Sequence, residues 1–428
     1  MVCGTMTDLL GELSWRGMLH QCTNLDGLRD HLREPRRVYA GFDPTSDSLT
    51  IGNLVPIMLL SHFQRAGHTP VVVMGGGTGL VGDPSGKEAE RQLRGEEQIR
   101  ANVAGQRKIF EQILRFEGDN AAVIINNLDW LGKLSFVEVL RDVGKHFSVN
   151  MMIQKDSVRR RLEQRSQGIS YTEFSYMILQ AFDFQWLFEH ENVSLQLGGS
   201  DQWGNIVAGV DLIRRVCQAE VFGLTTPLLA KSDGGKFGKT ETGAVWLTRD
   251  RTSAYAFYQF WMNAADADVG HFLKWFTMLP PEEVERIEAE HAAAPGRRLA
   301  QRTLAEHVTR RVHGDEHLVQ AEQASQALFS GDIDALPLEL LNEVFANVPS
   351  SAHPRASLET GMSVLDLLVE SGVAKSKREG RQYLDSGAIS VNGKRVDQEF
   401  RLTPGHLLHG SMACIRRGRK TWHVTRWS

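Results

Sequence analysis

The sequence is poor in cysteine and has no long apolar run, and each shortage removes a class of protein. Its four cysteines, Cys3, Cys22, Cys217 and Cys414, are scattered without CxxC pairing or histidine partners, so we expect free thiols and neither a disulfide framework nor a zinc site. No stretch approaches the roughly 20 apolar residues of a membrane span. The first residues lack the basic and apolar segments of a secretory signal, and we therefore expect a cytoplasmic protein.

The composition is that of an ordinary globular protein, but its charge is unevenly distributed. With 428 residues, 42% hydrophobic and 23% charged, the chain is long enough for two or three domains. Residues 361–428 hold 12 Lys+Arg against 6 Asp+Glu, a net charge of +6, so the rest of the chain carries −10 of the total of −4. A basic module on an acidic body indicates a polyanionic partner, most often nucleic acid, although a solvated basic surface is the alternative.

The first half of the chain alternates between apolar runs and helical patterns. Buried strands are predicted at Val38–Asp43, Pro70–Met74, Ala122–Asn126 and Val193–Leu197, and Gly52–Ala66 has apolar residues at helical spacing. This alternation predicts an α/β fold with a Rossmann-like, doubly wound parallel sheet. Ligands of such sheets bind at the carboxyl ends of the strands.

The second half predicts two further domains. Strand signals stop from about residue 264 to 330, where acidic segment starts and apolar residues three and four apart predict helices. We therefore expect a Rossmann-like catalytic domain over residues 1–235 and an α-helical domain, preceded by a mobile loop, over 236–346. The polar, proline-bearing residues 347–360 read as a linker, and residues 361–428 as a small, basic α+β domain with an Asn392-Gly393 turn.

The segment Lys236-Phe-Gly-Lys-Thr240, hereafter the lysine loop, places two lysines three residues apart beside several glycines. Each ammonium group is a compact donor for a phosphoryl oxygen, and glycine lets the backbone fold over a ligand. The lysine loop therefore predicts a site for a polyphosphate.

Two other glycine-rich motifs fail in detail. Gly77–Gly82 matches GxGxxG, but Asp83 and a proline follow it where a dinucleotide-binding helix should continue. Ser85–Lys87 is similar to part of a phosphate-binding loop, but Val81 stands where the first glycine should be and Glu88 where a magnesium-binding hydroxyl should be. Neither a dehydrogenase nor a P-loop enzyme is predicted.

Six segments form a characteristic set: Tyr39–Thr45, Gly75–Lys87, Asn126–Trp130, Tyr171–Gln180, Gly198–Asn205 and the lysine loop. Together they resemble the tyrosyl-tRNA synthetases of the bacterial or organellar type, which are class I enzymes. The resemblance runs from about residue 30 to the carboxyl terminus. It implies that the chain activates tyrosine with ATP and transfers it to the 3′ end of tRNA(Tyr). The alternatives are a tryptophanyl-tRNA synthetase, against which the basic tail argues, and a catalytically silent RNA-binding or splicing paralogue.

One segment departs from the family pattern. Class I enzymes carry a HIGH tetrapeptide after the first strand, and here that position reads Thr50-Ile-Gly-Asn53. Gly52 still allows adenine to approach the backbone, and the Asn53 amide can replace one imidazole donor. Thr50 keeps a hydroxyl but has a shorter reach.

The resemblance also implies the roles of individual residues. The catalytic set that it implies, most of which contact phosphate, is Lys236, Lys239, Thr240, Thr50, Asn53, Lys87 and Arg91. The ATP site is Ala40, Gly41, Asp43, Thr45, Gly52, Gly199 and Asp201, with Asp43 facing ATP or the substrate ammonium group and Asp201 the ribose. Mg²⁺ is expected to arrive on ATP, because no carboxylate cage for it is evident.

The tyrosine site is implied in the same way. Tyr39 and Asp183 are placed at the substrate hydroxyl, Asp83, Tyr176 and Gln180 at its ammonium group, and Thr78, Asn127 and Gln202 along the pocket. A site that hydrogen-bonds a hydroxyl rejects the analogue lacking it, as tyrosyl enzymes are known to reject phenylalanine.

The basic tail resembles a small RNA-binding domain that is shared with a ribosomal protein. Its expected tRNA contacts are Lys375, Lys377, Arg378, Arg381, Arg416, Arg417, Arg419 and Lys420. The apolar stretch Phe136–Met152 is either buried core or a subunit interface, and by analogy with the family we expect a symmetric homodimer.

Overall fold

The computed structural model describes residues 8–83, 95–155, 158–159, 162, 169–230, 232, 234–235, 237–240, 243–346, 348–418 and 421–428. The chain folds into two compact units. Unit 1 comprises Met1–Thr252 and Trp261–Val312, and unit 2 comprises Ser253–Phe260 and His313–Ser428. No helix formed by the described residues combines the length and the apolar character needed to cross a bilayer.

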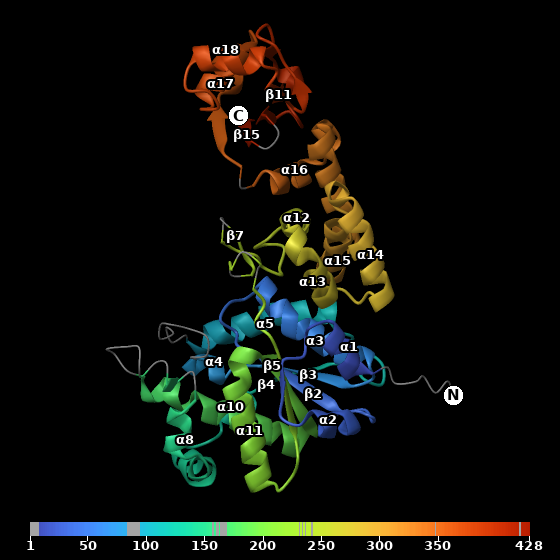
Figure 1. Ribbon diagram of the computed structural model, residues 1–428. Helices are drawn as coiled ribbons and strands as arrows, with labels where there is room; N and C mark the ends of the chain where they lie inside the picture. Colours follow the sequence, from blue (N-terminus) through green and yellow to red (C-terminus); the bar gives the residue numbers. More distant parts are fainter. Residues whose placement is uncertain are drawn as a thin grey trace. The chain divides into compact units, whose positions relative to one another are not determined.

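A six-stranded sheet forms the centre of unit 1 (Figure 1). Its strands are β1 (Gln21–Cys22), β2 (Arg37–Phe42), β3 (Thr69–Met74), β4 (Val123–Asn126), β5 (Val193–Gly199) and β6 (Phe222–Thr226), in the spatial order β1-β6-β5-β2-β3-β4. All neighbouring pairs are parallel except β1 with β6. The predicted doubly wound α/β fold is confirmed. Strands β1 and β6 were not predicted, because β1 is too short to leave an apolar pattern and β6 contains a glycine and two threonines.

Helices cover both faces of the sheet. On β2, Tyr39 points to one face, where its ring lies 5.3 Å from Phe184 of α10 (Tyr171–Glu191). Phe42 points to the other face, where its ring lies 4.7 Å from Phe110 of α5 (Glu96–Ile113). Side chains alternate across a strand, so a sheet buried on both faces needs apolar residues at consecutive positions. The continuous Val71–Met74 run of β3 is buried for this reason.

The remaining elements of unit 1 are mostly helical. They are α1 (Leu9–Trp15), α2 (Leu25–His31), η1 (Ile51–Asn53), α3 (Leu54–Arg65), α4 (Thr78–Val81), α6 (Leu128–Leu131), α7 (Phe136–Glu138), η2 (Val139–Val143), η3 (Gly144–His146), α8 (Val149–Ile153), η4 (Ser200–Gln202), α11 (Trp203–Val216), β7 (Lys239–Thr240), β8 (Gly243–Ala244), α13 (Asp266–Phe276), α14 (Pro281–Ala293) and η5 (Pro295–Arg297). Two helices span the boundary between the units, α12 (Ala254–Met262) and α15 (Leu299–Ser330). The second is kinked at Gly314, whose φ of 83° is not helical.

Unit 2 contains a five-stranded sheet in the order β12-β11-β14-β15-β9. Its elements are η6 (Ile333–Ala335), α16 (Leu338–Val344), β9 (Ser350–His353), η7 (Arg355–Leu358), β10 (Met362–Ser363), α17 (Val364–Glu370), α18 (Lys377–Asp385), β11 (Ile389–Val391), β12 (Lys394–Arg395), β13 (Arg401–Leu402), η8 (Pro404–His406), β14 (Met412–Arg417) and β15 (Thr421–Trp427). The predicted Asn392-Gly393 turn joins β11 to β12, with φ angles of 49° and 81°, as a tight hairpin turn requires.

The range expected to be a linker, residues 347–360, is partly ordered into the sheet of unit 2. Its strand β9 pairs in parallel with β15, from Ser350 opposite Val424 to His353 opposite Trp427. Such a short polar strand has no apolar alternation of its own. Only its partner strand supplies the hydrogen bonds that define it.

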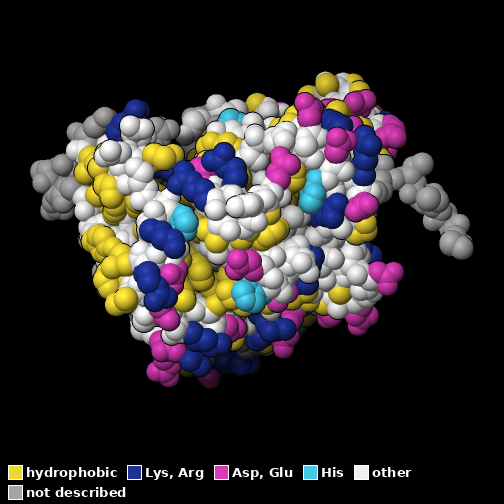
Figure 2. Space-filling model, turned by 90° about the horizontal axis from the view of Figure 1, so that it is seen from below, with side chains coloured by type: hydrophobic (Ala, Val, Ile, Leu, Met, Phe, Trp, Pro, Cys, Tyr) yellow, Lys and Arg dark blue, Asp and Glu magenta, His cyan; other side chains and the backbone are white. Residues whose placement is uncertain are grey.

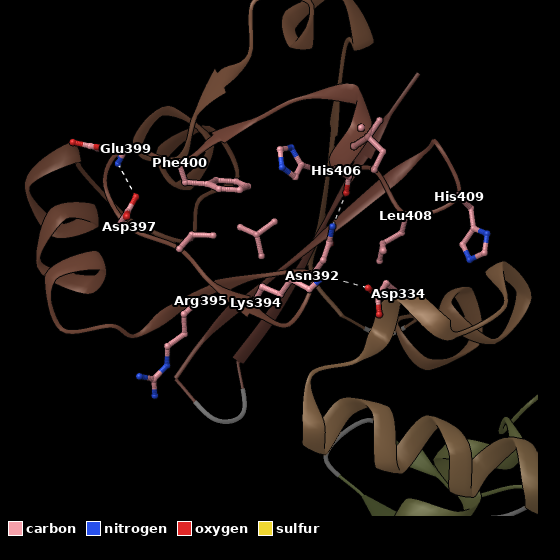
Figure 3. Close-up of a pocket in the computed structure, with 14 residues that line it drawn as sticks. Asp334, Asn392, Lys394, Arg395, Asp397, Glu399, Phe400, His406, Leu408 and His409 are labelled. Carbon is pink, nitrogen blue, oxygen red and sulfur yellow. Dashed lines mark hydrogen bonds and ion pairs between the residues drawn. The ribbon is translucent and has the colours of Figure 1, made fainter.

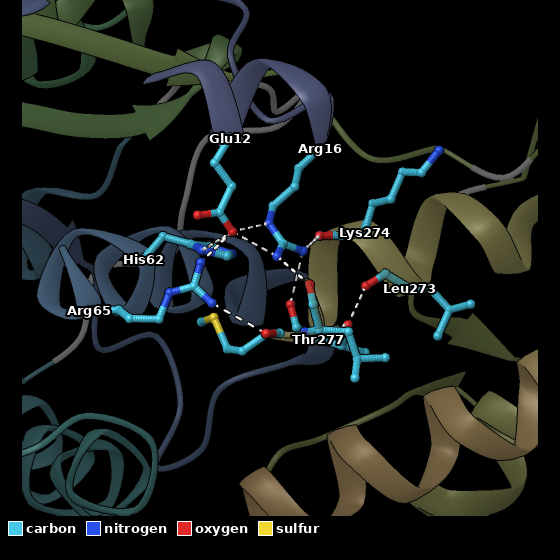
Figure 4. A network of polar contacts seen from close by, with 9 residues as sticks. Glu12, Arg16, His62, Arg65, Leu273, Lys274 and Thr277 are labelled. Atoms are coloured by element: carbon cyan, nitrogen blue, oxygen red, sulfur yellow. Dashed lines mark hydrogen bonds and ion pairs between the residues drawn. The ribbon is translucent and has the colours of Figure 1, made fainter. Parts of the chain in front are cut away.

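A buried arginine joins three parts of unit 1 (Figure 4). The Arg16 guanidinium donates to the carbonyls of Lys274, in the last turn of α13, and of Thr277 and Leu279, just beyond it, at 2.7, 3.2 and 2.7 Å. Its Nε also donates to Glu12 at 2.8 Å, and Glu12 pairs in turn with Arg65 of α3. Helix termini leave carbonyl groups without intrahelical partners, and Arg16 satisfies these groups while it is itself fully buried.

We predict that Arg16→Met lowers the free energy of unfolding by about 2–4 kcal/mol, because it leaves three carbonyl acceptors and one carboxylate short of a donor. Urea denaturation would measure the change. The matched control is Arg100→Met, which breaks an i,i+4 pair with Glu96 in which the Arg100 side chain is 70% exposed. Exposed pairs contribute little, so equal effects of the two substitutions would contradict a structural role for Arg16.

Candidate active site

The sequence-predicted site residues converge on one edge of the sheet. Asp43 follows β2, Thr78 follows the glycines after β3, Asn127 follows β4, and Asp201 and Gln202 follow β5. Parallel strands end at the same edge, and β2 lies between β3 and β5, where the connections diverge to opposite sides. That position is where open α/β sheets bind their ligands.

Helix α10 supplies three further predicted residues. Tyr176, Gln180 and Asp183 are spaced by four and three positions and therefore share one face of the helix. The Tyr176 hydroxyl donates to Asp43 Oδ1 at 3.3 Å, and Gln180 Oε1 accepts from Asn205 Nδ2 at 3.0 Å. The spacing predicted from the sequence thus brings these side chains to residues at the end of β2 and on α11.

Asp183 is the most perturbed acid of this cluster. Its two oxygens accept from Asn127 Nδ2 at 2.8 Å and from Trp130 Nε1 at 2.7 Å. Burial raises the pKa of Asp183 to about 7, although both hydrogen bonds favour the ionised form and so oppose the shift. Asn127 itself is fixed, because its Oδ1 accepts from the Gly77 backbone and its Nδ2 also donates to Thr78 Oγ1 at 3.0 Å.

The Tyr39 hydroxyl is buried beside this carboxylate. Among the described residues it has no hydrogen-bond partner, and only 2% of Tyr39 is exposed. Burial raises its pKa well above the ordinary value, with the Asp183 charge as a second cause, so the hydroxyl stays neutral and can donate. An unpaired buried hydroxyl is costly. A ligand that carries its own hydroxyl group would satisfy both Tyr39 and Asp183.

A second polar group surrounds Asp83. Gln202 Nε2 donates to Asp83 Oδ2 at 2.8 Å, and Asn205 Nδ2 lies 3.4 Å from Gln202 Oε1. The buried Asp83 carboxylate is thus held by α11 and the turn that precedes it. All eight predicted tyrosine-binding residues are among the described residues. Seven of them form a side-chain hydrogen bond with another member of the set or with Asp43, Trp130 or Asn205. The eighth is Tyr39, whose hydroxyl has no partner among the described residues.

The tetrapeptide Thr50–Asn53 forms the start of the helix after β2. Asn53 Oδ1 accepts from both the Thr50 backbone N–H and the Thr50 hydroxyl, at 3.1 and 2.9 Å. The Thr50 hydroxyl therefore donates its hydrogen to Asn53. The Asn53 Nδ2 group is the part of the same amide that can donate to a ligand. Gly52 is exposed, and a Cβ built there would meet no atom closer than Thr50 Oγ1 at 3.8 Å, so its backbone is accessible.

The chain that continues from the lysine loop pairs with the segment around this tetrapeptide. Ile51 N–H donates to the Val245 carbonyl at 2.9 Å, Leu247 N–H to Leu49 at 2.8 Å, and Val245 N–H to Gly238 at 3.0 Å. Within the lysine loop itself, a Cβ on Gly238 would lie 2.5 Å from Ile51 Cγ2 and 3.8 Å from the Gly52 nitrogen, so its backbone is next to the tetrapeptide. Lys87, Arg91 and Lys236 lie outside the described residues, as do the side chains of Lys239 and Thr240.

The remaining expected ATP residues lie on β2 and β5 or close to them. Ala40 is buried and Gly41 exposed within β2, and Thr45 N–H donates to the Asp43 carbonyl at 2.8 Å. At the end of β5, a Cβ on Gly199 would lie 2.6 Å from Asp201 Oδ1. Among the described residues, no cluster of three or more His, Cys, Asp or Glu side chains could hold a metal ion.

Trp130 is a site residue that was not predicted from the sequence. It stood in one of the matching segments but received no role, although its indole donates to Asp183. Its ring stacks on Trp186 at 4.1 Å, and Trp186 stacks on His190 at 4.5 Å. The sequence signal was the pair Trp186 and His190, one turn apart on α10, but their partner Trp130 comes from another segment.

A separate cavity of about 740 Å³ lies in unit 2 (Figure 3). Its walls include Asn392, Lys394, Phe400, His406 and Leu408, together with charged residues of both signs. None of the predicted tyrosine or ATP residues lines it, and no sequence pattern anticipated it.

The expected tRNA contacts of unit 2 fall into two groups. Lys375, Lys377, Arg378 and Arg381 are exposed on α18 or just before it. Arg416 and Arg417 are half-buried instead, and their guanidinium groups lie 5.1 Å from the ring centres of Trp422 and Tyr383, respectively. Arg417 also donates to the Val373 carbonyl at 3.1 Å, so internal packing occupies these two side chains. Arg419 and Lys420 lie outside the described residues.

Apolar side chains gather on one face of unit 1. Figure 2 shows hydrophobic side chains along its left edge, where Figure 1 places α8. They include Phe136, Val137, Leu140, Val149, Met151 and Ile153, of which Phe136 is 65% exposed. Met152, by contrast, is buried against Val158 and Met177. The apolar stretch thus contributes to both the core and the surface, and we call its exposed part the apolar face.

Comparisons with known proteins agree with this geometry. A family model described as "tRNA synthetases class I (W and Y)" matches residues 31–330, and one described as "Tyrosine--tRNA ligase SYY-like C-terminal domain" matches residues 341–425. Tyrosine–tRNA ligases of Roseiflexus castenholzii and Geobacillus stearothermophilus are each 51% identical over 425 residues, which is 98% of this chain and 100% of each relative.

A solved structure is similar as well. The C-terminally truncated mitochondrial tyrosyl-tRNA synthetase of Aspergillus nidulans superposes with a TM-score of 0.69 at 30% identity, covering 76% of this chain and 95% of that chain. Relatives matched over their full length are tyrosine–tRNA ligases, so the tryptophanyl and silent-paralogue alternatives are not favoured. The chain belongs to the bacterial-type tyrosyl-tRNA synthetases, the class I ligases that join tyrosine to its tRNA.

Proposed function

We propose that the residues at the carboxyl edge of the sheet divide tyrosine activation into a phenol site, an ammonium site and a phosphate site. In activation, the tyrosine carboxylate attacks the α-phosphate of ATP and pyrophosphate leaves. The nucleophile is already ionised, so the enzyme needs no general base and contributes position and charge. The observation that carries the proposal is the open Tyr39 hydroxyl beside the Asp183 carboxylate.

The phenol site consists of Tyr39 and Asp183. Tyr39 donates a hydrogen bond to the substrate hydroxyl oxygen, and Asp183 accepts a hydrogen bond from the same hydroxyl, which satisfies both buried groups at once. Asn127 and Trp130 hold the carboxylate in place, and Asn127 in turn holds Thr78. Phenylalanine would leave these groups unpaired, and we therefore expect it to be rejected.

The ammonium site consists of Asp83, Tyr176 and Gln180. Gln202 orients Asp83, and Asn205 orients Gln180. Asp43 accepts from Tyr176 and adds negative charge on the side where ATP binds. A carboxylate with a phenol and an amide oxygen provides acceptors for the three N–H donors of an ammonium group.

The phosphate site consists of the lysine loop, with Lys236, Lys239 and Thr240, and of the tetrapeptide that lies against it. Asn53 supplies an amide donor, Thr50 holds Asn53, and Gly52 lets adenine approach. Lys87 and Arg91 add positive charge, Ala40, Gly41 and Thr45 contact ATP, and Gly199 with Asp201 binds the ribose. Mg²⁺ binds between the phosphates of ATP and needs no protein cage.

Transfer of tyrosine requires tRNA(Tyr), which we propose binds the exposed cations on α18, with Arg419 and Lys420 as further contacts. We propose a catalytic part over residues 1–235, a phosphate loop with a helical part over 236–346 and an RNA-binding part over 361–428. Residues 347–360 join the last two and add β9 to the sheet. We place the enzyme in the cytoplasm, where tRNA is charged.

We predict that Lys236→Ala and Lys239→Ala each slow tyrosyl-adenylate formation by about 100-fold or more, because each removes a donor to the transition state. Tyrosine affinity should change less than about twofold, since neither lysine belongs to the phenol or ammonium site. Tyrosine-dependent ATP–pyrophosphate exchange and equilibrium dialysis measure the two quantities. Lys108→Ala, at an exposed position on α5, is the control. Loss of tyrosine binding in either variant would refute this division of roles.

The Asp183 pKa predicts a pH dependence of tyrosine binding. Since this pKa is about 7, Asp183 is mostly protonated at pH 6 and mostly ionised at pH 8, and only the ionised form is a full acceptor for the phenol. Tyrosine affinity should therefore rise about tenfold between pH 6 and pH 8. Asp183→Asn should weaken binding and abolish the pH dependence, whereas Trp130→Phe, which removes one stabilising donor, should move the midpoint to higher pH. A flat profile for the unaltered enzyme would contradict the assignment.

We also propose that the apolar face is the interface of a symmetric homodimer. An exposed apolar patch on a globular protein marks an interaction surface, and a two-fold interface places the same patch on both subunits. Val137→Asp should shift the enzyme from dimer to monomer in light scattering coupled to size exclusion. Val319→Asp, at an exposed apolar position of unit 2, is the matched control. A monomeric unaltered enzyme would refute the interface.

A further inference from the structure

The lysine loop carries one apolar side chain, Phe237, between its two lysines, and that ring is packed. The centre of the Phe237 ring lies 5.2 Å from the ring centre of Phe272, 5.5 Å from that of Phe276 and 6.0 Å from that of Trp261. The Phe237 and Phe276 rings are stacked, with an interplanar angle of 13°. Phe272 and Phe276 are one turn apart on α13, and all three partner rings are buried. We call these three rings the aromatic seat.

The residue after Phe237 is held from the other side. Gly238 has φ of 79°, and a Cβ there would lie 2.5 Å from Ile51 Cγ2. Only glycine accepts both conditions without strain. The backbone is therefore fixed between the aromatic seat on one side and the tetrapeptide on the other. A second connection to α13 is the Ser232 N–H, which donates to Asp268 Oδ1 at 2.9 Å.

A chain of contacts also links α13 to the helix that follows the tetrapeptide. Arg16 caps carbonyls at the end of α13 and just beyond it, and its partner Glu12 pairs with Arg65 at the end of α3. Helix α3 begins directly after the tetrapeptide. The helix that carries two rings of the seat is therefore bonded, through Arg16 and Glu12, to the helix that starts at the tetrapeptide.

We propose that Phe237 is a positioning residue for tyrosine activation. Its ring, seated on Trp261, Phe272 and Phe276, fixes the backbone at Gly238 beside Ile51. The strand β7 continues from this fixed point with Lys239, the lysine proposed to bind the phosphates of ATP. Without the ring, this polar, glycine-rich segment would keep its backbone hydrogen bonds to Val245 and β8, but ATP binding would have to complete its ordering, at a cost in conformational entropy. This inference rests on the proposed role of Lys239 in binding phosphate.

The test compares Phe237→Ala and Phe237→Met in the full-length chain. For the alanine variant we expect the kcat/KM for ATP in adenylate formation to fall about 10- to 100-fold. The reason is that ATP binding must then order one or two residues that the ring holds in place in the unaltered enzyme. Tyrosine affinity should stay unchanged, since Phe237 belongs to neither the phenol site nor the ammonium site. Methionine, which adapts to aromatic surroundings, should restore most of the loss.

Two controls make the outcome decisive. Phe400→Ala removes a half-buried ring from unit 2 and should leave activation unchanged. Phe276→Leu removes one ring of the aromatic seat. Its effect should not add to that of Phe237→Ala, since each change removes the same contact between Phe237 and the seat. Normal activation by Phe237→Ala, an equal loss of tyrosine affinity, or a methionine variant no better than alanine would each overturn the inference.

Lys239→Ala, assayed in parallel, separates this inference from the proposed function. If Lys239→Ala slows activation and Phe237→Ala does not, the positioning role alone is wrong. If Lys239→Ala has no effect, the phosphate role of the lysine loop is wrong, and the inference falls with it.

Discussion

Backbone hydrogen bonds between residues 49–51 and 245–247 join two distant parts of the chain, and the geometry of the proposed phosphate site depends on them. One part lies between β2 and α3, and the other continues from the lysine loop. Because the bonds involve main-chain groups, they fix the two segments whatever their side chains are. This explains how a tetrapeptide that has lost both histidines of its family pattern can keep its place. Compared with the family pattern, the two histidine donors are absent from this position, and the Asn53 amide is the main side-chain donor in their place.

Substrate selection depends on a different constraint, which is burial without full pairing. Asp183 is buried with two donors, yet its pKa still rises to about 7, and the neighbouring Tyr39 hydroxyl has no partner among the described residues. A folded protein tolerates such groups at a cost in stability. In the proposed phenol site a substrate hydroxyl removes this cost, so the same burial that perturbs the acid would favour tyrosine as the ligand. Trp130 and Asn127 keep the carboxylate oriented before the substrate arrives.

Much of the fold could be predicted because local pattern was sufficient. Four strands of the central sheet and α3 were visible as apolar runs and helical spacing, and Tyr176, Gln180 and Asp183 share a helix face by spacing alone. The features that were missed depend on distant parts of the chain. Strands β1 and β9 are defined by partner strands distant in sequence. Trp130 contacts Asp183 only because α10 brings that residue to it, and the contacts of Arg416 and Arg417 with Trp422 and Tyr383 likewise follow from the fold.

The sequence by itself determined the class of chemistry. Lysines, glycines and amides in characteristic segments indicate phosphate binding without an acid–base pair, and the six matching segments identify the family. Only the tertiary structure decided how those groups are held. Phe237 is an ordinary loop residue until α13 places aromatic rings around it, and Arg16 is one charge among many until it is buried against carbonyls far along the chain. The physical reason is that packing and desolvation depend on neighbours in space, which residue spacing along the chain does not specify.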